Sequence, residues 1–206
     1  MTVAAIVVAG GSGQRFGGPK QFQLVAGRTL ASWSVAAARG AAELVVLVVP
    51  EGYDGDGEGA DLVTTGGATR SDSVRAGLAL CGDAEVILVH DAARPNASAA
   101  LFARVVAAVR AGADGVVPGV AVADTLKRVE NGVVTETIPR DGVVVVQTPQ
   151  GFRASSLRAA HERGLDATDD AGLVERWGGV VVVVPGEANN LKVTTPDDMD
   201  RVEVAR

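Results

Sequence analysis

A glycine-rich segment near the N-terminus is the part of the sequence best suited to holding phosphate groups. Residues 9–20 read Ala-Gly-Gly-Ser-Gly-Gln-Arg-Phe-Gly-Gly-Pro-Lys and form the end of an apolar run and the turn after it. We call this segment the glycine loop. Glycines let a backbone approach a ligand closely and turn its N–H groups toward phosphate oxygens. Two cations flank these glycines, Arg15 and Lys20, and we expect them to surround a triphosphate and offset its charge.

Two widespread phosphate-binding motifs do not match the glycine loop. A Walker loop requires G-x-x-x-x-G-K-[ST], but Lys20 is preceded by Pro19 and followed by Gln21. A dinucleotide-binding loop requires G-x-G-x-x-G, but Phe16 stands at the position of the third glycine. A glycine turn without a ligand is the remaining alternative, and the two flanking cations argue against it.

A second candidate is Asp91, which follows the apolar run 85–90. Ligands of open α/β sheets bind at the carboxyl ends of the strands, so an aspartate there is placed to meet one. The alternative for Asp91 is a helix cap or an ion pair with Arg94. His90 precedes it and is assigned no chemical role.

Composition limits the partners that such a site would serve. The net charge of −6 argues against nucleic acid and anionic membranes, since both require a basic surface. The three lysines, Lys20, Lys127 and Lys192, all fall in segments that carry candidate site residues. Cys81 is the only cysteine, and no apolar run reaches the roughly 18 residues of a membrane span, so we expect a soluble cytoplasmic protein.

Apolar runs alternate with helical patterns along the whole chain. This alternation predicts one α/β domain over residues 1–206, with three layers and a mainly parallel, Rossmann-like sheet. Buried strands are expected at 3–9, 44–50, 61–65, 85–90, 115–118, 143–148 and 180–184, with helices at 71–81 and 97–111 and a last helix starting at Thr195. The segment 53–61 is interpreted as a surface loop.

Residues 120–142 interrupt this alternation. Two polar, strand-like pieces, 125–130 and 133–138, are joined by Asn131 and Gly132, which is a strong hairpin signal. Because an isolated hairpin is only marginally stable in water, we expect this arm to lean on another surface, that of a second subunit.

Several motifs together resemble one family of nucleotidyltransferases, the 2-C-methyl-D-erythritol 4-phosphate cytidylyltransferases. They are the glycine loop, Gly66-Gly67 with Arg70, Asp72 and Ser73, the run 90–95, the run 124–127, Arg140, the run 147–150 with Phe152, Thr168-Asp169 with Ala171, and Asn190 with Lys192, Val193 and Thr194. They span almost the whole chain in the family's order.

The resemblance implies a reaction of CTP with the methylerythritol phosphate that releases pyrophosphate. It implies catalytic roles for Arg15, Lys20 and Lys192, and Mg²⁺ or another divalent cation at Asp91. It implies nucleotide contacts by Ala9, Gly10, Gly11, Gly13, Gly67, Ser73, Ala92 and Arg94. It implies acceptor contacts by Thr125, Arg140, Thr148 and Thr168, the first two reaching across a homodimer. Thr168 also has the position of a helix N-cap.

An attacking phosphate monoester, with a second pKa near 6, is already mostly a dianion at neutral pH and needs no general base. The chain departs from the family's pattern in the short spacing between Arg15 and Pro19, and at Ala68, where an aspartate is common. Two rival functions stay open: a ribitol 5-phosphate or sugar-phosphate nucleotidyltransferase, and a CTP-binding protein without catalysis.

Overall fold

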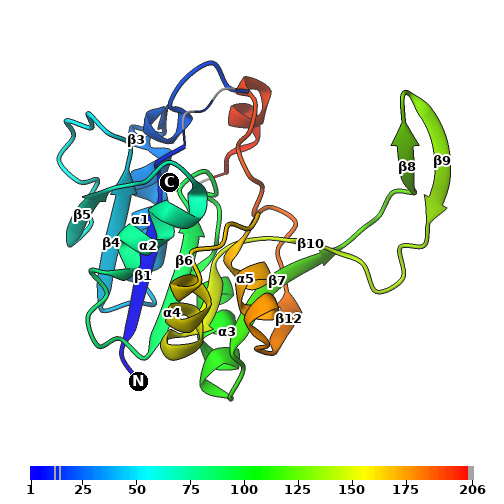
Figure 1. Ribbon diagram of the computed structural model, residues 1–206. Coiled ribbons are helices and arrows are strands. Elements are labelled where there is room, and N and C mark those ends of the chain that lie inside the picture. The colour runs from blue at the N-terminus through cyan, green and yellow to red at the C-terminus, as the bar shows by residue number, and fades with distance from the viewer. Residues whose placement is uncertain (12, 14, 204–206) are drawn as a thin grey trace.

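The apolar runs form one twisted sheet at the centre of the protein (Figure 1). The computed structural model describes residues 1–11, 13 and 15–203. Strand order in the sheet is β10-β7-β11-β6-β1-β4-β5, and β12 pairs with β7. The strands are β1 (Val3–Val8), β4 (Leu44–Val49), β5 (Leu62–Thr65), β6 (Val86–Asp91), β7 (Gly115–Ala121), β10 (Val144–Val146), β11 (Gln150–Arg153) and β12 (Val181–Pro185).

Most of the strands run parallel, as the sequence predicts. β1 lies between β4 and β6 and is parallel to both. β5 pairs in parallel with β4, and β12 pairs in parallel with β7. The exceptions are β10 and β11, which run antiparallel to their neighbours. The predicted strand 143–148 shortens to β10, and β11 was not predicted, because its four residues carry too little apolar pattern.

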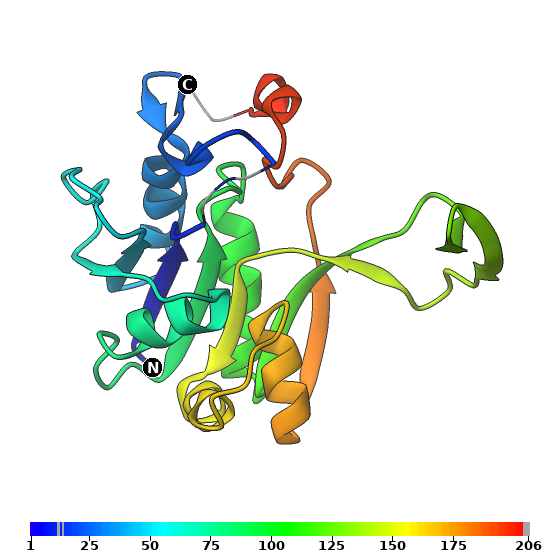
Figure 2. The same ribbon diagram turned by 45° about the horizontal axis from the view of Figure 1, so that its top comes forward.

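Helices cover both faces of the sheet, so the domain has the three layers that were predicted (Figure 2). Alternate residues of β1 enter different cores: Val3, Ala5 and Val7 pack under α1 (Leu30–Arg39) and α3 (Ala99–Arg110). Ala4 and Ile6 face the opposite core. That core is covered by α2 (Arg70–Leu78), α4 (Ala154–Glu162) and α5 (Asp170–Trp177).

The helix starts are set by side-chain caps. Thr69 and Asp72 form a capping box, so α2 begins at Arg70, one residue before the predicted start. The prediction that Thr168 caps a helix is wrong by one residue. Asp169 is the cap of α5, and its carboxylate accepts from the Gly172 N–H at 3.0 Å. The last predicted helix is the short 3₁₀ helix η2 (Pro196–Arg201), which follows a capping box on Thr195.

The remaining short elements lie near the glycine loop. They are the 3₁₀ helix η1 (Lys20–Phe22) and the strand pair β2 (Leu24–Val25) and β3 (Arg28–Thr29). Phe22 stacks on Tyr53 at a centroid distance of 5.0 Å, so the 53–61 connection, which contains neither helix nor strand, supports η1. Both views place η2 near the segment that follows the glycine loop (Figures 1 and 2).

The predicted hairpin forms and projects away from the sheet (Figure 1). It consists of β8 (Leu126–Glu130) and β9 (Val133–Ile138), and we call residues 120–142 the arm. Asn131 and Gly132 both have positive φ, 51° and 81°, as a tight hairpin turn requires. Val129, Val133 and Val134 are exposed on the arm, so its apolar side chains find little cover within one subunit. No helix in the described part of the chain has the length and apolarity needed to cross a membrane.

Candidate active site

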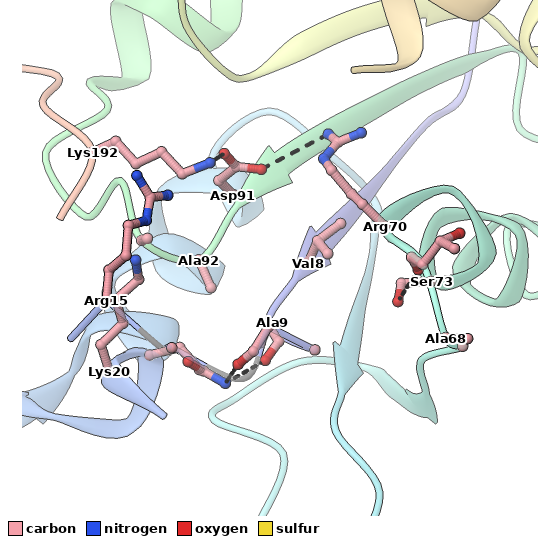
Figure 3. Close-up of a pocket in the computed structure, with 17 residues that line it drawn as sticks. Val8, Ala9, Arg15, Lys20, Ala68, Arg70, Ser73, Asp91, Ala92 and Lys192 are labelled. Carbon is pink, nitrogen blue, oxygen red and sulfur yellow. Dashed lines mark hydrogen bonds and ion pairs between the residues drawn. The ribbon is translucent and has the colours of Figure 1, made fainter. Parts of the chain in front are cut away.

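A pocket of about 670 Å³ opens where β1 and β6 end and α2 begins (Figure 3). This is the edge at which open α/β sheets bind their ligands. The predicted site residues that line it are Ala9, Gly10, Gly11, Gly13, Arg15, Lys20, Gly67, Ser73, Asp91, Ala92 and Lys192. The structure therefore gathers eleven of the predicted residues, from four separate segments, around one cavity.

The glycine loop is held in a tight turn by its own backbone. The N–H groups of Phe16, Gly17 and Gly18 donate to the Gly13 carbonyl at 2.8, 3.0 and 3.3 Å. Gly13 has a φ of 67°, and a Cβ there would collide with the Gly18 carbonyl, so only glycine fits. Positions 12 and 14 of the loop lie outside the described residues.

Gln21 fixes the base of the loop and was missed in the sequence. Its buried side-chain amide donates to the Ala9 carbonyl at 2.6 Å and to the Gly11 carbonyl at 3.0 Å. These bonds tie η1, which begins at Lys20, to the end of β1. The only sequence signal was the position of a glutamine directly after Lys20.

Asp91 is the centre of charge in the pocket. Lys192 Nζ lies 2.6 Å from its Oδ2, and an Arg70 nitrogen lies 3.8 Å from its Oδ1. Burial alone would raise the pKa of Asp91, but the positive charges of Lys192 and Arg70 outweigh burial and hold it at about 2. The carboxylate is therefore ionised throughout the physiological range.

Three positively charged side chains, Arg15, Lys20 and Lys192, line the pocket close together and favour binding of an anion. Burial lowers the pKa of Lys20, and the neighbouring charges of Lys192 and Arg15 lower it further. Figure 3 shows Arg15, Lys20 and Lys192 converging on the same side of the cavity. A bound polyphosphate would relieve this repulsion, because its negative charges would lie between the cations.

Thr148 supports Asp91 from behind instead of lining the pocket. The Asp91 N–H donates to Thr148 Oγ1 at 3.0 Å, and Thr148 Oγ1 lies 3.1 Å from Nδ1 of His90. Burial lowers the pKa of His90 to about 4, so the ring is neutral at pH 7. Its Nε2 faces the Arg94 carbonyl at 3.2 Å. His90 and Thr148 thus act on the end of β6 through hydrogen bonds.

Arg94 also lies outside the pocket lining, contrary to the expectation of a nucleotide contact. It is buried, and its guanidinium donates to the Asn190 carbonyl at 2.7 Å. The Asn190 amide donates to the Thr148 carbonyl at 2.9 Å, and the Val193 N–H donates to the Ala93 carbonyl at 2.8 Å. Arg94 therefore helps to position the segment that carries Lys192.

The predicted acceptor residues lie away from the pocket of the same subunit. Thr125 and Arg140 are exposed on the arm, where Arg140 donates to the Ala123 carbonyl, and Thr168 is exposed before α5. Their substrate roles stay predictions. Arg70, which lines the pocket beside Asp91, was part of the recognised motif but was given no role.

The donor set suits a divalent cation bound jointly with phosphate. Asp91 is the one carboxylate among the described residues that line the pocket, and these residues contain no cluster of three or more potential ligands. Mg²⁺ typically takes one or two carboxylates together with phosphate oxygens and water. Asp91 fits that pattern. The described residues around the pocket could not enclose a metal ion without ligands from phosphate and water.

Comparisons with known proteins identify the family to which the chain is similar. The family described as 2-C-methyl-D-erythritol 4-phosphate cytidylyltransferase matches residues 3–205. The protein of that name from Thermus thermophilus is 45% identical over 205 residues, covering 97% of this chain and 94% of its own. Its crystal structure superposes with a TM-score of 0.86 over 98% of this chain and 97% of that one, at 39% identity.

Some relatives are longer. The "Bifunctional enzyme IspD/IspF" of Rhodospirillum rubrum is 44% identical over 216 residues, which are 98% of this chain and 56% of that protein. The chain thus spans about half the length of these bifunctional relatives. From the match over residues 3–205 and the near full-length likeness to the Thermus protein, the chain belongs to the 2-C-methyl-D-erythritol 4-phosphate cytidylyltransferase family.

Proposed function

We propose that the chain transfers the cytidylyl group of CTP to 2-C-methyl-D-erythritol 4-phosphate and releases pyrophosphate. The main support for this proposal is the ionised Asp91, which is paired with Lys192 and lines the same glycine-walled pocket as Arg15 and Lys20. Family membership supports the choice of both substrates.

The proposed step is a direct displacement at the α-phosphorus. An oxygen of the acceptor's phosphate forms the new P–O bond while the bond to the bridging oxygen of pyrophosphate breaks. The acceptor phosphate is already ionised, so the neutral, buried His90 is not needed as a base. Catalysis then consists of alignment and charge stabilisation, which Arg15 and Lys20 provide where charge builds on the α-phosphoryl and the leaving pyrophosphate.

Recognition of cytosine is assigned to backbone groups at the pocket wall. Ala9, Gly10 and Gly67 expose backbone there, and the Ser73 hydroxyl is oriented because it donates to the Thr69 carbonyl at 3.0 Å. Side chains on Gly66 or Gly67 would collide with Ser73 or Asp72, so the glycines keep this wall thin. Such a close polar site rejects other bases by leaving its own groups unpaired.

A divalent cation, Mg²⁺ in the simplest case, completes the proposed site. Asp91 would hold it together with the triphosphate, and the ion would supply charge neutralisation at the phosphates when bound. Lys192 keeps Asp91 ionised and oriented.

The arm is proposed to build a homodimer. Its exposed valines favour burial against a second copy, and Arg140 and Thr125 would then reach the acceptor phosphate of the partner's site. Neither residue lines the pocket of its own subunit, which supports the proposal that each acts at the partner's pocket.

Pyrophosphate release with CTP, Mg²⁺ and each candidate acceptor tests the proposal. We expect turnover with methylerythritol phosphate and at most weak turnover with ribitol 5-phosphate or a sugar 1-phosphate. Preference for one of those acceptors would assign a sister activity. Binding of CTP without pyrophosphate release from any acceptor would indicate a nucleotide sensor.

A further inference from the structure

Arg70 lines the pocket and forms an ion pair with a buried carboxylate, Asp170, that has no role in the proposed reaction. Arg70 is the first residue of α2, lines the pocket, and donates from Nη1 to Asp170 Oδ2 at 2.7 Å. Asp170 is the first residue of α5 and does not line the pocket. The pair therefore couples an element outside the pocket to one of its cations.

Asp170 is built to stay in one place. Its side chain is fully buried, and its second oxygen, Oδ1, lies 3.0 Å from His161 Nε2, so each oxygen has a partner. Its position in the first turn of α5 adds a favourable interaction with the positive end of the helix. A buried carboxylate held on both sides is a rigid anchor for the guanidinium that pairs with it.

Arg70 stops short of Asp91. Its Nη2 lies 3.8 Å from Asp91 Oδ1, whereas Lys192 contacts the other oxygen, Oδ2, at 2.6 Å. A guanidinium free to move would close to about 2.8 Å and bind a carboxylate through two parallel hydrogen bonds. Figure 3 shows Arg70 and Lys192 on opposite sides of Asp91. The anchor at Asp170 accounts for this gap.

We propose that Asp170 is a positioning residue that holds Arg70 back from Asp91, so that Asp91 Oδ1 remains available to the divalent cation. The inference rests on the proposed function, because it assumes that Asp91 binds a metal together with CTP. Without the charge of Asp170, Arg70 closes on Asp91 and competes with the metal for the carboxylate.

The test measures metal binding directly. Free Mn²⁺ is counted by electron paramagnetic resonance with and without protein at the same CTP concentration, so that the Mn²⁺ held by CTP alone is subtracted. Acceptor is left out, so that no turnover is involved. Asp170→Asn keeps the size of the side chain and removes its charge. We expect the Kd of Mn²⁺ to rise by about five-fold, which corresponds to the upper end of the contribution of a single ion pair, about 1 kcal/mol.

A second variant separates positioning from a merely structural role. In D170N/R70M the competing guanidinium is gone, and we expect the Kd of Mn²⁺ to return to within about two-fold of wild type. His161→Gln is the matched control: the Gln side-chain amide can still donate to Asp170 Oδ1 and leaves the pair of Asp170 with Arg70 in place, so we expect a lower Tm and an unchanged Mn²⁺ affinity. If Asp170 has only a structural role, all three variants should be less stable than wild type, and the R70M substitution should not restore the Mn²⁺ affinity.

The outcomes are distinguishable. If the wild type with CTP binds no Mn²⁺ beyond the amount held by CTP alone, the metal site of the proposed function fails. If the wild type binds Mn²⁺ and a folded Asp170→Asn binds it equally well, the positioning role of Asp170 is wrong. Should Asp170→Asn not fold, D170N/R70M is compared with D170N/R70K, which keeps a cation at position 70. Weaker Mn²⁺ binding by D170N/R70K supports the proposal, and equal affinity of the two variants contradicts it.

Discussion

Lys192 Nζ lies 2.6 Å from Asp91 Oδ2, although the two residues are 101 positions apart in the chain. Asp91 is fixed at the end of a central strand, whereas Lys192 stands in a segment without helix or strand. That segment is tied down by the Val193 N–H, which donates to the Ala93 carbonyl at 2.8 Å, and by the Arg94 bond to Asn190. The site therefore depends on how the C-terminal segment docks beside β6.

Removing Lys192 should disable the site without unfolding the protein. In Lys192→Ala, Asp91 loses its contacting cation and the phosphates lose a positive charge. We expect kcat/KM to fall by about 10²- to 10³-fold, as when one electrostatic contact to a transition state is removed. Steady-state kinetics and thermal unfolding check this. Arg176→Ala, on the exposed face of α5, is the control and should behave like wild type.

The proposed role of the arm predicts complementation between two inactive variants. Arg15→Ala disables the site of its own subunit, whereas Arg140→Ala disables the site of its partner. Unfolding and refolding the two variants together should produce mixed dimers in which one site carries both arginines, restoring about a quarter of the sites. Activity is measured against each variant refolded alone. No recovery, in mixed dimers shown to form, would place Arg140 in its own subunit's site or outside catalysis.

Gln21 should set the shape of the glycine loop. Gln21→Ala removes two buried hydrogen bonds and leaves the Ala9 and Gly11 carbonyls without that partner. We expect a loss of about 1–3 kcal/mol in the free energy of unfolding and a raised KM for CTP. Urea denaturation and kinetics measure both quantities. Gln23→Ala, two residues later and exposed, should change neither. Equal effects in the two variants would show that the loop does not depend on Gln21.

Acid should destabilise the fold through His90. Burial lowers the pKa of His90 from 6.5 to about 4 in the folded state, whereas the unfolded chain takes up this proton near 6.5. The unfolded state therefore binds more protons between pH 6.5 and 4, and the free energy of unfolding falls across that window by about 3 kcal/mol from this residue. Urea denaturation at a series of pH values should give a steeper fall for wild type than for His90→Gln. Parallel curves would mean that His90 does not contribute.

The sequence predicted the central fold well because its strongest signals are periodic and local. Apolar runs such as 44–50 gave β4, and the Asn131-Gly132 pair gave the hairpin. α1 and α4 were missed because small or polar residues, such as Ser34 and Ser156, make up much of their buried faces and give no clear apolar pattern in the sequence. β11 was missed because Gln150 and Gly151 lack strand character and are buried through tertiary packing.

The sequence predicted which residues form the site but not how their side chains are arranged in space. Motif spacing brought out the glycine loop and Asp91, yet nothing local to Thr148 or Arg94 shows that their side chains point behind the pocket. The ion pair of Arg70 with Asp170 joins residues 100 positions apart and leaves no periodic trace. Such contacts are decided by how α2 and α5 pack on the sheet.

The central claim is that the triphosphate of CTP lies against the glycine loop, between Arg15, Lys20 and the pair of Asp91 with Lys192. A crystal structure of the protein with CTP and Mg²⁺ tests it most directly. We predict the phosphates beside residues 10–20, with Arg15 and Lys20 in contact and the metal on Asp91. A nucleotide bound elsewhere on the sheet, or with its base at the loop and its phosphates pointing away, would contradict the account.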